Sequence, residues 1–434
     1  MFPSPYFSDI YFKRSEETLK QAVESVPLYR EWKSLLKPNG RSIDQLYRDL
    51  PVLNKRAIRE HFPGGLVPEG KDLQEGLDTG AVAYVNTSGT TEEVVTNIWN
   101  QEWWNASEAA SWKLNRHTMH LDHSVKEAQL ASALSVGFLS EDTDLDMQAR
   151  MLGRFLFLNE KGNANHWKVE HYQRMMHELE DFRPAVLEAN PSLLARLSWW
   201  ASRNDRKNTE LPVVLFTYEL LATMQLRQIE KAFPVPLASS YGSTETGYVF
   251  MQCEHGTFHQ NTDYCRVDFE PLPEKHGGPG IGRIFVTTFQ NPWTSMIRFD
   301  VGDLVRLHET GICPCGRKEG LMLAAIEGRV ANLSYKPGGG MVTTHFVDEQ
   351  LSGIDDLLDY QLWQPSLNEI QVKLLSLEES KETMKEAIAL LKGIYGPGVA
   401  VSAEFCRAIE PSASGKFFRT WSALKPKPEE LFLL

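Results

Sequence analysis

The sequence predicts a two-domain α/β protein, with a large N-terminal domain of mixed and parallel sheets (residues 1–328) and a small, mobile α+β C-terminal domain (residues 329–434). A chain of 434 residues is too long for one ordinary hydrophobic core. Apolar strand-like runs alternate with helical stretches between residues 150 and 235, which favours parallel pairing of the strands. A glycine-rich loop, Lys336-Pro337-Gly338-Gly339-Gly340, then precedes about a hundred residues, enough for a second domain.

Composition limits the class of protein. Apolar residues make up 42% and charged residues 24%, as in ordinary globular enzymes, and the net charge of -12 argues against a nucleic-acid partner. We expect no membrane partner, because no apolar run reaches membrane-spanning length and the N-terminus lacks the features of a signal peptide. Five unevenly spaced cysteines do not form a disulfide framework, which predicts a cytoplasmic location with reduced thiols.

The N-terminal region is predicted to be helical. Apolar spacing indicates a helix over residues 15–35 that begins at Ser15, and Asn54 is placed to cap a short helix. A further helix is expected over residues 101–135. This segment carries His117, His120 and His123 at intervals of three. A helix could bring two of them together as metal ligands, but no Cys or carboxylate completes a set at ligand spacing, and polar helix or loop residues are the alternative.

The central body follows as alternating elements. Strands are predicted at 155–158, 185–187 and 213–216, and helices at 166–180, 192–203 and 219–232. Ligands of parallel sheets bind beyond the carboxyl ends of the strands, so the polar residues after each strand are the first candidates for a site.

The first candidate site is a hydroxyl-rich loop between two predicted strands, Ala81–Val85 and Val94–Trp99. Small residues let backbone N–H groups approach an anion, and the Thr and Ser hydroxyls add donors, so the loop can cradle phosphate. It lacks the Gly-Lys-Ser/Thr and following helix of a Walker loop. The alternative is a polar surface hairpin. The candidate residues are Thr87, Ser88, Gly89, Thr90 and Thr91.

A second loop of this kind follows another short predicted strand. Its aromatic ring offers a flat face to a nucleobase, its hydroxyl can bind phosphate, and its carboxylate can hold Mg²⁺. The alternative is a turn with an exposed Glu. The residues are Tyr241, Gly242, Ser243, Thr244 and Glu245.

Two further polar residues stand beside glycines. Asp303 follows Gly302 at an expected turn between strands, where its carboxylate could accept from both ribose hydroxyls; a hairpin Asp is the alternative. Lys416 follows Ser414-Gly415 and is expected to project from a loop of the C-terminal domain.

Taken together and in order, these blocks resemble the acyl- and aryl-adenylate-forming synthetase superfamily. The chain looks most like the phenylacetate–CoA ligase branch, which includes coenzyme F390 synthetase-like proteins. The resemblance covers nearly the whole chain. It rests on Thr87-Ser88-Gly89-Thr90-Thr91, Tyr241-Gly242-Ser243-Thr244-Glu245, Gly302-Asp303, Gly328-Arg329 and Ser414-Gly415-Lys416, with N-terminal pieces at 26–30 and 50–53 and a cysteine-containing pair at 253–259 and 313–316.

The resemblance implies a role for each motif. The first loop would hold the pyrophosphate end of ATP, Tyr241 would stack on adenine and Asp303 would hold ribose. Thr244, Glu245 and Lys416 would be the catalytic residues, the first two on phosphate and Mg²⁺ and the Lys bridging the carboxylate and the α-phosphate. Arg329 would complete the nucleotide site. The implied cofactors are ATP/AMP, Mg²⁺ and CoA, and the small domain would rotate between two half-reactions.

The chain departs from this family pattern in two places. After the Thr pair the family usually continues Gly-x-Pro-Lys, whereas here Glu92 and Glu93 follow. The hinge after Gly328-Arg329 usually carries an Asp, whereas here Ala331 and Asn332 occupy the place. These changes predict a specialised biosynthetic member rather than a catabolic ligase.

A possible zinc site forms a separate prediction. Cys253, His259, Cys313 and Cys315 make a Cys₃His set suited to structural Zn²⁺, with His255 as a rival to His259. The alternative is a group of reduced surface cysteines.

The sequence therefore predicts an ATP-dependent enzyme that activates a carboxylic acid, expected to be aromatic, and transfers it to CoA as a thioester. One rival passes the adenylate to an amine or a carrier-protein thiol, or releases it. Another is a nucleotide-binding relative with reduced catalysis. The partners expected are small molecules; assembly is open, with a homodimer as one option.

Overall fold

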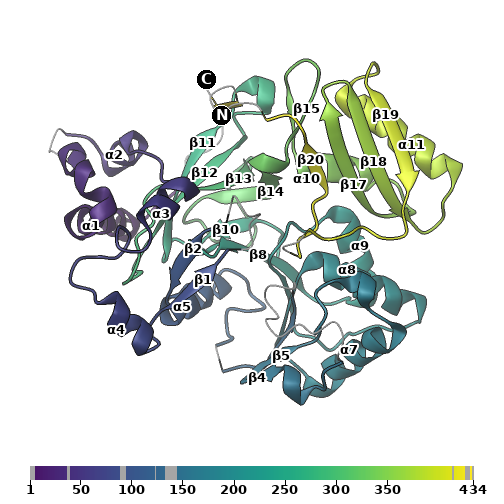
Figure 1. Cartoon of the computed structure of the whole chain (residues 1–434), viewed down its shortest axis with the longest axis horizontal. Coiled ribbons are helices and arrows are strands. Elements are labelled where there is room, and N and C mark those ends of the chain that lie inside the picture. Colours follow the sequence, from purple (N-terminus) through teal and green to yellow (C-terminus); the bar gives the residue numbers. More distant parts are fainter. Residues whose placement is uncertain are drawn as a thin grey trace. The chain divides into compact units, whose positions relative to one another are not determined.

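The computed structural model describes residues 5–36, 40–87, 94–122, 124–131, 144–412, 415–425 and 431–432 (Figure 1). The chain forms two compact units. Unit 1 comprises residues 1–123, 240–271 and 282–325, and unit 2 comprises residues 124–239, 272–281 and 326–434. This division does not test the domain boundary near residue 328, which stays a prediction.

The N-terminal part of unit 1 is helical, as predicted, but its first helix has other bounds. The Ser8 hydroxyl accepts from the Tyr11 N–H, so the helix begins at Asp9 rather than at Ser15. It ends before Pro27, after which the chain continues as a 3₁₀ helix. Asn54 caps a short helix as predicted, with its Oδ1 2.9 Å from the Ala57 nitrogen. The elements are α1 (Asp9–Ser25), η1 (Pro27–Leu36), α2 (Ile43–Asp49), α3 (Lys55–His61) and α4 (Leu73–Asp78).

A hairpin and a helix follow in unit 1. Strands β1 (Ala83–Asn86) and β2 (Thr96–Trp99) pair antiparallel, and α5 spans Gln101–Trp112. The predicted helix over 101–135 was too long. The Thr118 hydroxyl donates to the Trp112 carbonyl at 2.7 Å, and such side-chain bonds to the backbone compete with a helical ladder. His117 and His120 therefore lie in turns after the helix, and His123 lies outside the described residues.

Antiparallel pairing dominates the sheet of unit 1. β10 pairs antiparallel with both β9 and β14, and β11 pairs antiparallel with β12. Strand β8 contributes residues from Ser240 onward to this unit, where it pairs antiparallel with β9. In sheet order the strands are β11 (Cys265–Pro271), β12 (Ile281–Thr288), β13 (Phe299–Leu307), β14 (Met322–Arg329), β10 (Phe258–Gln260), β9 (Gly247–Gln252) and β8 (Leu237–Ser243).

Unit 2 contains the predicted parallel sheet. Strands β5 (Phe155–Phe157), β3 (Glu127–Leu130), β6 (Val186–Ala189), β7 (Val214–Phe216) and the start of β8 pair parallel in this order, and β4 (Met151–Leu152) adds an antiparallel edge. The connecting helices α7 (Val169–Phe182), α8 (Pro191–Arg203) and α9 (Thr223–Ala232) share one buried core with the strands. The predicted strands and helices of this region are confirmed, except that two helices begin later than predicted: α7 at Val169 rather than residue 166, and α9 at Thr223 rather than residue 219.

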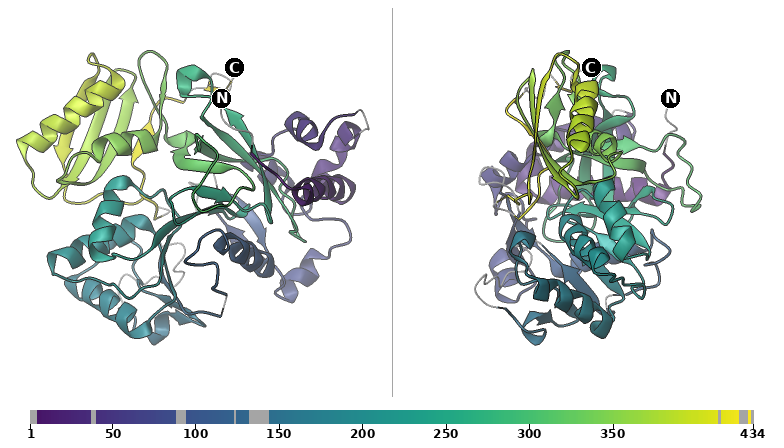
Figure 2. Two further views of the ribbon diagram at one scale, coloured as in Figure 1. Left: turned by 180° about the vertical axis from the view of Figure 1, so that it is seen from behind. Right: turned by 90° about the vertical axis from the view of Figure 1, so that its right-hand side faces the viewer.

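The C-terminal part of unit 2 is α+β, as predicted. A four-stranded sheet has the order β19 (Ala400–Phe405), β18 (Glu369–Ser376), β17 (Leu357–Ser366), β20 (Thr420–Ser422). Helix α11 (Lys381–Tyr395) lies along this sheet (Figure 2), and its Ala387 and Leu391 share a buried cluster with strand residues. Helix α10 (Thr344–Leu351) packs into the same cluster, and β15 (Ser334–Tyr335) pairs with β16 (Met341–Val342) beside it.

A buried ionic network braces the parallel sheet. The fully buried Arg150 forms hydrogen bonds to both carboxylate oxygens of Glu178 and donates to the carbonyls of Phe157 and Leu158 at 2.6 and 3.2 Å. Arg174 donates to the buried Glu160 at 2.6 Å. Buried charges are tolerated only when paired in this way, so the network holds helix α7 to β5. No helix in the described part of the chain has the length and apolar character needed to cross a membrane.

Candidate functional site

The second hydroxyl-rich segment is a tight β-hairpin. Tyr241, Gly242 and Ser243 belong to strand β8 itself, so only residues 244–246 form the turn before β9, a shorter loop than predicted. The strands approach so closely that a Cβ at Gly242 would lie 2.2 Å from the Gly247 carbonyl oxygen. Gly247 has a φ of +67°, a conformation that suits glycine. The backbone therefore fixes where the turn presents its side chains.

Helix α5 holds this hairpin in place. The Ser107 hydroxyl accepts from the Tyr248 N–H at 3.1 Å, and the Tyr248 hydroxyl donates to Glu108 at 2.6 Å. All three residues are buried or nearly so. A helix that bonds to both backbone and side chain of β9 restricts the hairpin from behind.

Tyr241 and Asp303 lie side by side. The Tyr241 hydroxyl donates to Asp303 Oδ2 at 2.7 Å, although the two residues are 62 positions apart in the chain. The prediction of a turn at Asp303 was wrong, because Phe299–Leu307 is one strand, β13. Gly302 has a φ of +80° and its N–H is bound by Asp300 at 2.9 Å, which kinks the strand without ending it.

Glu245 is a buried carboxylate in the turn of this hairpin. Its Oε1 has no hydrogen-bond partner among the described residues. A buried carboxylate oxygen of this kind suits a hard cation such as Mg²⁺. Beside it the hydroxyls of Ser243 and Thr246 lie 3.0 Å apart, and Thr244 is partly buried. The donor set therefore fits the metal that the sequence predicted.

The first hydroxyl-rich segment follows strand β1 as predicted. Thr87 closes the hairpin: its N–H donates to the Val95 carbonyl at 2.9 Å and its hydroxyl accepts from the Val95 N–H at 3.0 Å. The acceptor role leaves the hydroxyl proton for another partner. Ser88, Gly89, Thr90 and Thr91, with Glu92 and Glu93, lie outside the described residues.

Arg329 and Lys416 belong to unit 2, whereas the residues above belong to unit 1. Arg329 ends strand β14, and Gly328 before it has a φ of +107°. Lys416 lies in a loop, and its backbone carbonyl accepts from the Ser412 N–H at 2.8 Å. Gly415 has a φ of +78°, consistent with the expected turn; Ser414 lies outside the described residues.

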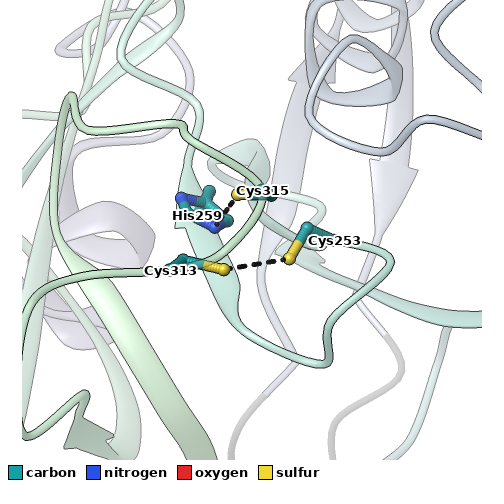
Figure 3. Close-up of side chains that lie close together, drawn as sticks. All are labelled: Cys253, His259, Cys313 and Cys315. Carbon is teal, nitrogen blue, oxygen red and sulfur yellow. Dashed lines mark hydrogen bonds between the residues drawn. The ribbon is translucent and has the colours of Figure 1, made fainter.

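The four predicted zinc ligands come together in unit 1 (Figure 3). Cys253 follows β9, His259 lies in β10, and Cys313 and Cys315 lie between β13 and β14. The ligand atoms all lie within 4.8 Å of one another, with Cys253 Sγ 3.6 Å from Cys313 Sγ and Cys315 Sγ 3.3 Å from His259 Nε2. Around tetrahedral Zn²⁺, the S···S and S···N separations are about 3.8 and 3.6 Å. The cluster fits this metal.

His259, and not its rival, lies in the cluster. His255 stands in the turn between β9 and β10, where its N–H points at Cys253 Sγ at 3.4 Å. Burial lowers the pKa of His259 to about 4, which keeps the imidazole neutral, the form that binds metals. Next to the cluster, Arg317 donates to both oxygens of Glu254 at 3.3 and 3.2 Å and ties the two cysteine-bearing segments together.

Solved structures with the same fold match most of the chain. A 2-hydroxyisobutyryl-CoA ligase, in the postadenylation state in complex with 2-HIB-AMP, matches with a TM-score of 0.67 at 16% identity, over 91% of this chain and 85% of that one. An anthranilate CoA ligase with anthranoyl-AMP matches at 0.51 and 12%, over 78% and 65%. ATP-bound MatB from Rhodopseudomonas palustris matches at 0.50 and 14%, over 77% and 66%.

The chain has the adenylate-forming ligase fold. The fold class predicted from the sequence is confirmed. No protein-family model and no curated protein matches the chain.

The sequence did not predict the residues that contact the loop of Lys416. Glu219 follows β7 and accepts from the Phe417 N–H at 2.9 Å, and Arg419 bonds to Asp359 at 3.2 Å. The one available signal was the position of Glu219 just beyond the carboxyl end of a parallel strand, where ligand-binding residues gather.

Proposed function

We propose that this protein uses ATP to activate a carboxylic acid. A carboxylate oxygen attacks the α-phosphorus, pyrophosphate leaves and an acyl-adenylate forms; the thiol of CoA then attacks the acyl carbon and AMP leaves. The Tyr241–Asp303 pair carries this proposal, because it sets an aromatic face for adenine beside a carboxylate for ribose. The fold supports it, since ligases that share the fold hold ATP or acyl-AMP.

The phosphates would be bound by the hairpin turn and the first loop. Thr87 and Thr244 would donate hydroxyl hydrogen bonds to phosphate oxygens, together with the backbone of the first loop. The buried oxygen of Glu245 that has no partner among the described residues would hold Mg²⁺. The positive charge of this ion would offset the negative charge of the phosphates. By holding this ion, Glu245 would help to orient the polyphosphate relative to Tyr241.

Lys416 would supply the cation where the carboxylate meets the α-phosphate, and Arg329 would assist at the nucleotide. Negative charge accumulates there in the transition state, and a preoriented ammonium stabilises it without reorganisation of water. Lys416→Ala should slow adenylation by ~10²–10³-fold. The reaction of a supplied acyl-adenylate with CoA should be largely unchanged. Ala331→Asp should leave adenylation unchanged and alter only the thiol step.

The acid and its acceptor are the finer parts of the proposal. We infer an aromatic acid and CoA, as in the phenylacetate–CoA ligase-like branch that the sequence resembles. Ligases with this fold act on acids as different as 2-hydroxyisobutyrate and anthranilate. The test panel must therefore include both aromatic and short hydroxy acids.

ATP–pyrophosphate exchange across this panel is the decisive experiment. Exchange that depends on one aromatic acid, followed by thioester formation with CoA, would support the whole proposal. Exchange without a thioester would point to an amine or carrier-protein acceptor. Tight ATP binding with no exchange for any acid would favour the relative with reduced catalysis, which the acidic Glu92 and Glu93 also favour.

We also propose that Cys253, His259, Cys313 and Cys315 hold a structural Zn²⁺. Burial raises the pKa of the Cys253 thiol to about 12, so the metal would have to displace its proton, as zinc does in such sites. The four ligands join the β9–β10 hairpin to the loop between β13 and β14. Their role would be to fix that loop and not to take part in catalysis.

Metal analysis of protein purified without chelator tests this site. About one zinc per chain is expected. His259→Ala should lose the metal, whereas His255→Ala, the matched control, should retain it. Full metal content in a Cys313→Ser/Cys315→Ser double variant would reject the site.

A further inference from the structure

The loop that carries Lys416 is bound to the parallel-sheet part of unit 2 immediately after the lysine. The Phe417 N–H donates to Glu219 Oε1 at 2.9 Å. The other carboxylate oxygen of Glu219 accepts from the Ser192 hydroxyl, at the start of α8, at 2.9 Å. One oxygen of Glu219 is therefore fixed by the Ser192 hydroxyl, while the other binds the backbone of the loop.

Two neighbouring side chains strengthen the attachment. The phenyl ring of Phe417 packs against the buried core beneath α7, α8 and α9. Arg419 is buried, donates to the Leu220 carbonyl at 3.2 Å and lies 3.2 Å from Asp359 on β17. Residues 417 and 419 are therefore both fixed.

A carboxylate at position 219 has an electrostatic cost. Burial raises the pKa of Glu219, while the Phe417 N–H, Arg419 and Ser192 act in the opposite direction. A neutral side chain would avoid this cost, so stability alone does not require an acid here. A charged acceptor binds a backbone N–H more strongly than a neutral one and fixes it more closely.

We propose that Glu219 is a positioning residue for Lys416: it fixes the backbone amide that follows the lysine and thereby sets the lysine for the adenylation step. This inference rests on the proposed function. The bond would be needed in the first half-reaction and would have no part in the attack of the thiol. A misplacement of about 1 Å can cost about 10²-fold in rate, so loss of the carboxylate should slow adenylation by roughly 10- to 100-fold.

The first test is independent of catalysis. Hydrogen exchange at the Phe417 amide, followed without substrates, should become about tenfold faster in Glu219→Ala and change less in Glu219→Gln, which keeps an acceptor oxygen. Glu230→Ala, which removes an exposed carboxylate on α9, is the matched control and should leave this amide unchanged. Unchanged exchange in Glu219→Ala would overturn the positioning contact, whatever the protein catalyses.

The second test uses a double-mutant cycle in pyrophosphate exchange. Glu219→Ala should lower kcat by about 10- to 100-fold with little change in KM for ATP, with partial recovery in Glu219→Gln. In a Lys416→Ala background the same substitution should have almost no effect, because the residue acts through the lysine. Equal costs in both backgrounds would overturn the proposal. A wild-type chain inactive with every acid would overturn the proposed function and the catalytic part of this inference, leaving the exchange result to judge the contact.

Discussion

Asp303→Ala is the sharpest test of the nucleotide site. A carboxylate has about four acceptor positions, and the Tyr241 hydroxyl donates to Asp303 Oδ2 at 2.7 Å, which orients the group proposed to bind ribose. Loss of a charge-assisted hydrogen bond costs about 1.5–3 kcal/mol. ATP affinity should therefore fall by about 10- to 150-fold, since each 1.4 kcal/mol is tenfold.

Tyr241→Phe separates the ring from its hydroxyl. The phenyl face remains available to adenine, while the bond that orients Asp303 is lost, so ATP affinity should fall by only about 2- to 12-fold, corresponding to about 0.5–1.5 kcal/mol. In the Asp303→Ala background the same change should cost little, because its partner is already gone.

Isothermal calorimetry with ATP would measure both variants, and their thermal midpoints would show that they fold. Asp263→Ala is a suitable control: it removes a surface carboxylate of the same unit, paired with Arg14 at 2.7 Å, and exposed pairs contribute little. Wild-type ATP affinity in a folded Asp303→Ala protein would refute the ribose assignment. Additive losses in the double variant would refute the role of the Tyr241 hydroxyl.

Three further predictions concern the framework. Arg150→Met should destabilise unit 2 by about 3–5 kcal/mol because it removes both hydrogen bonds of the buried Glu178 to Arg150 and leaves, among the described residues, only the longer contact with Arg174, at 3.8 Å. Adding Glu178→Gln should recover part of this loss in denaturant unfolding, and no recovery would contradict the pairing. Burial and the nearby Glu127 raise the pKa of Glu188 from its usual 4.5 to about 7. Between pH 4.5 and pH 7 the folded protein therefore holds a proton that the unfolded chain has lost, so the free energy of unfolding falls as the pH rises through this range. Glu188→Gln should remove that loss, so its thermal midpoint relative to wild type should be more favourable at pH 8 than at pH 5; an equal difference at both would count against it. Gly242→Ala should disrupt the β8–β9 hairpin and lower thermal stability, whereas Gly338→Ala, in open space, should not.

The sequence predicted correctly those elements whose formation depends on neighbouring residues in the chain. The alternation between residues 150 and 235 predicted the parallel sheet because its helices and strands differ in apolar period, and Asn54 predicted a helix start because capping acts within one turn. The end of α5 was missed because it depends on a hydroxyl bond from Thr118. The course of β13 through Asp303 was missed because a left-handed Gly302 suits a kink as well as a turn.

The site divides in the same way. Tyr241, Asp303 and the zinc ligands stood beside glycines or in short spacings that the sequence displays. The choice of His259 over His255 required the pairing of β10, since it is the strand that directs this ring toward the cysteines. Glu219 was missed because its partner lies 198 residues away and no local signal joins them.

The close approach of Gly242 to Gly247 also bears on how distant relatives could be recognised. Any Cβ at residue 242 would collide with the carbonyl oxygen of Gly247, a backbone atom that cannot move aside. Sterics therefore oppose a substitution at Gly242, and the left-handed backbone conformation of Gly247 disfavours other residues there. An alignment of remote homologues should be anchored on their five-residue spacing, and the surrounding apolar positions should carry less weight.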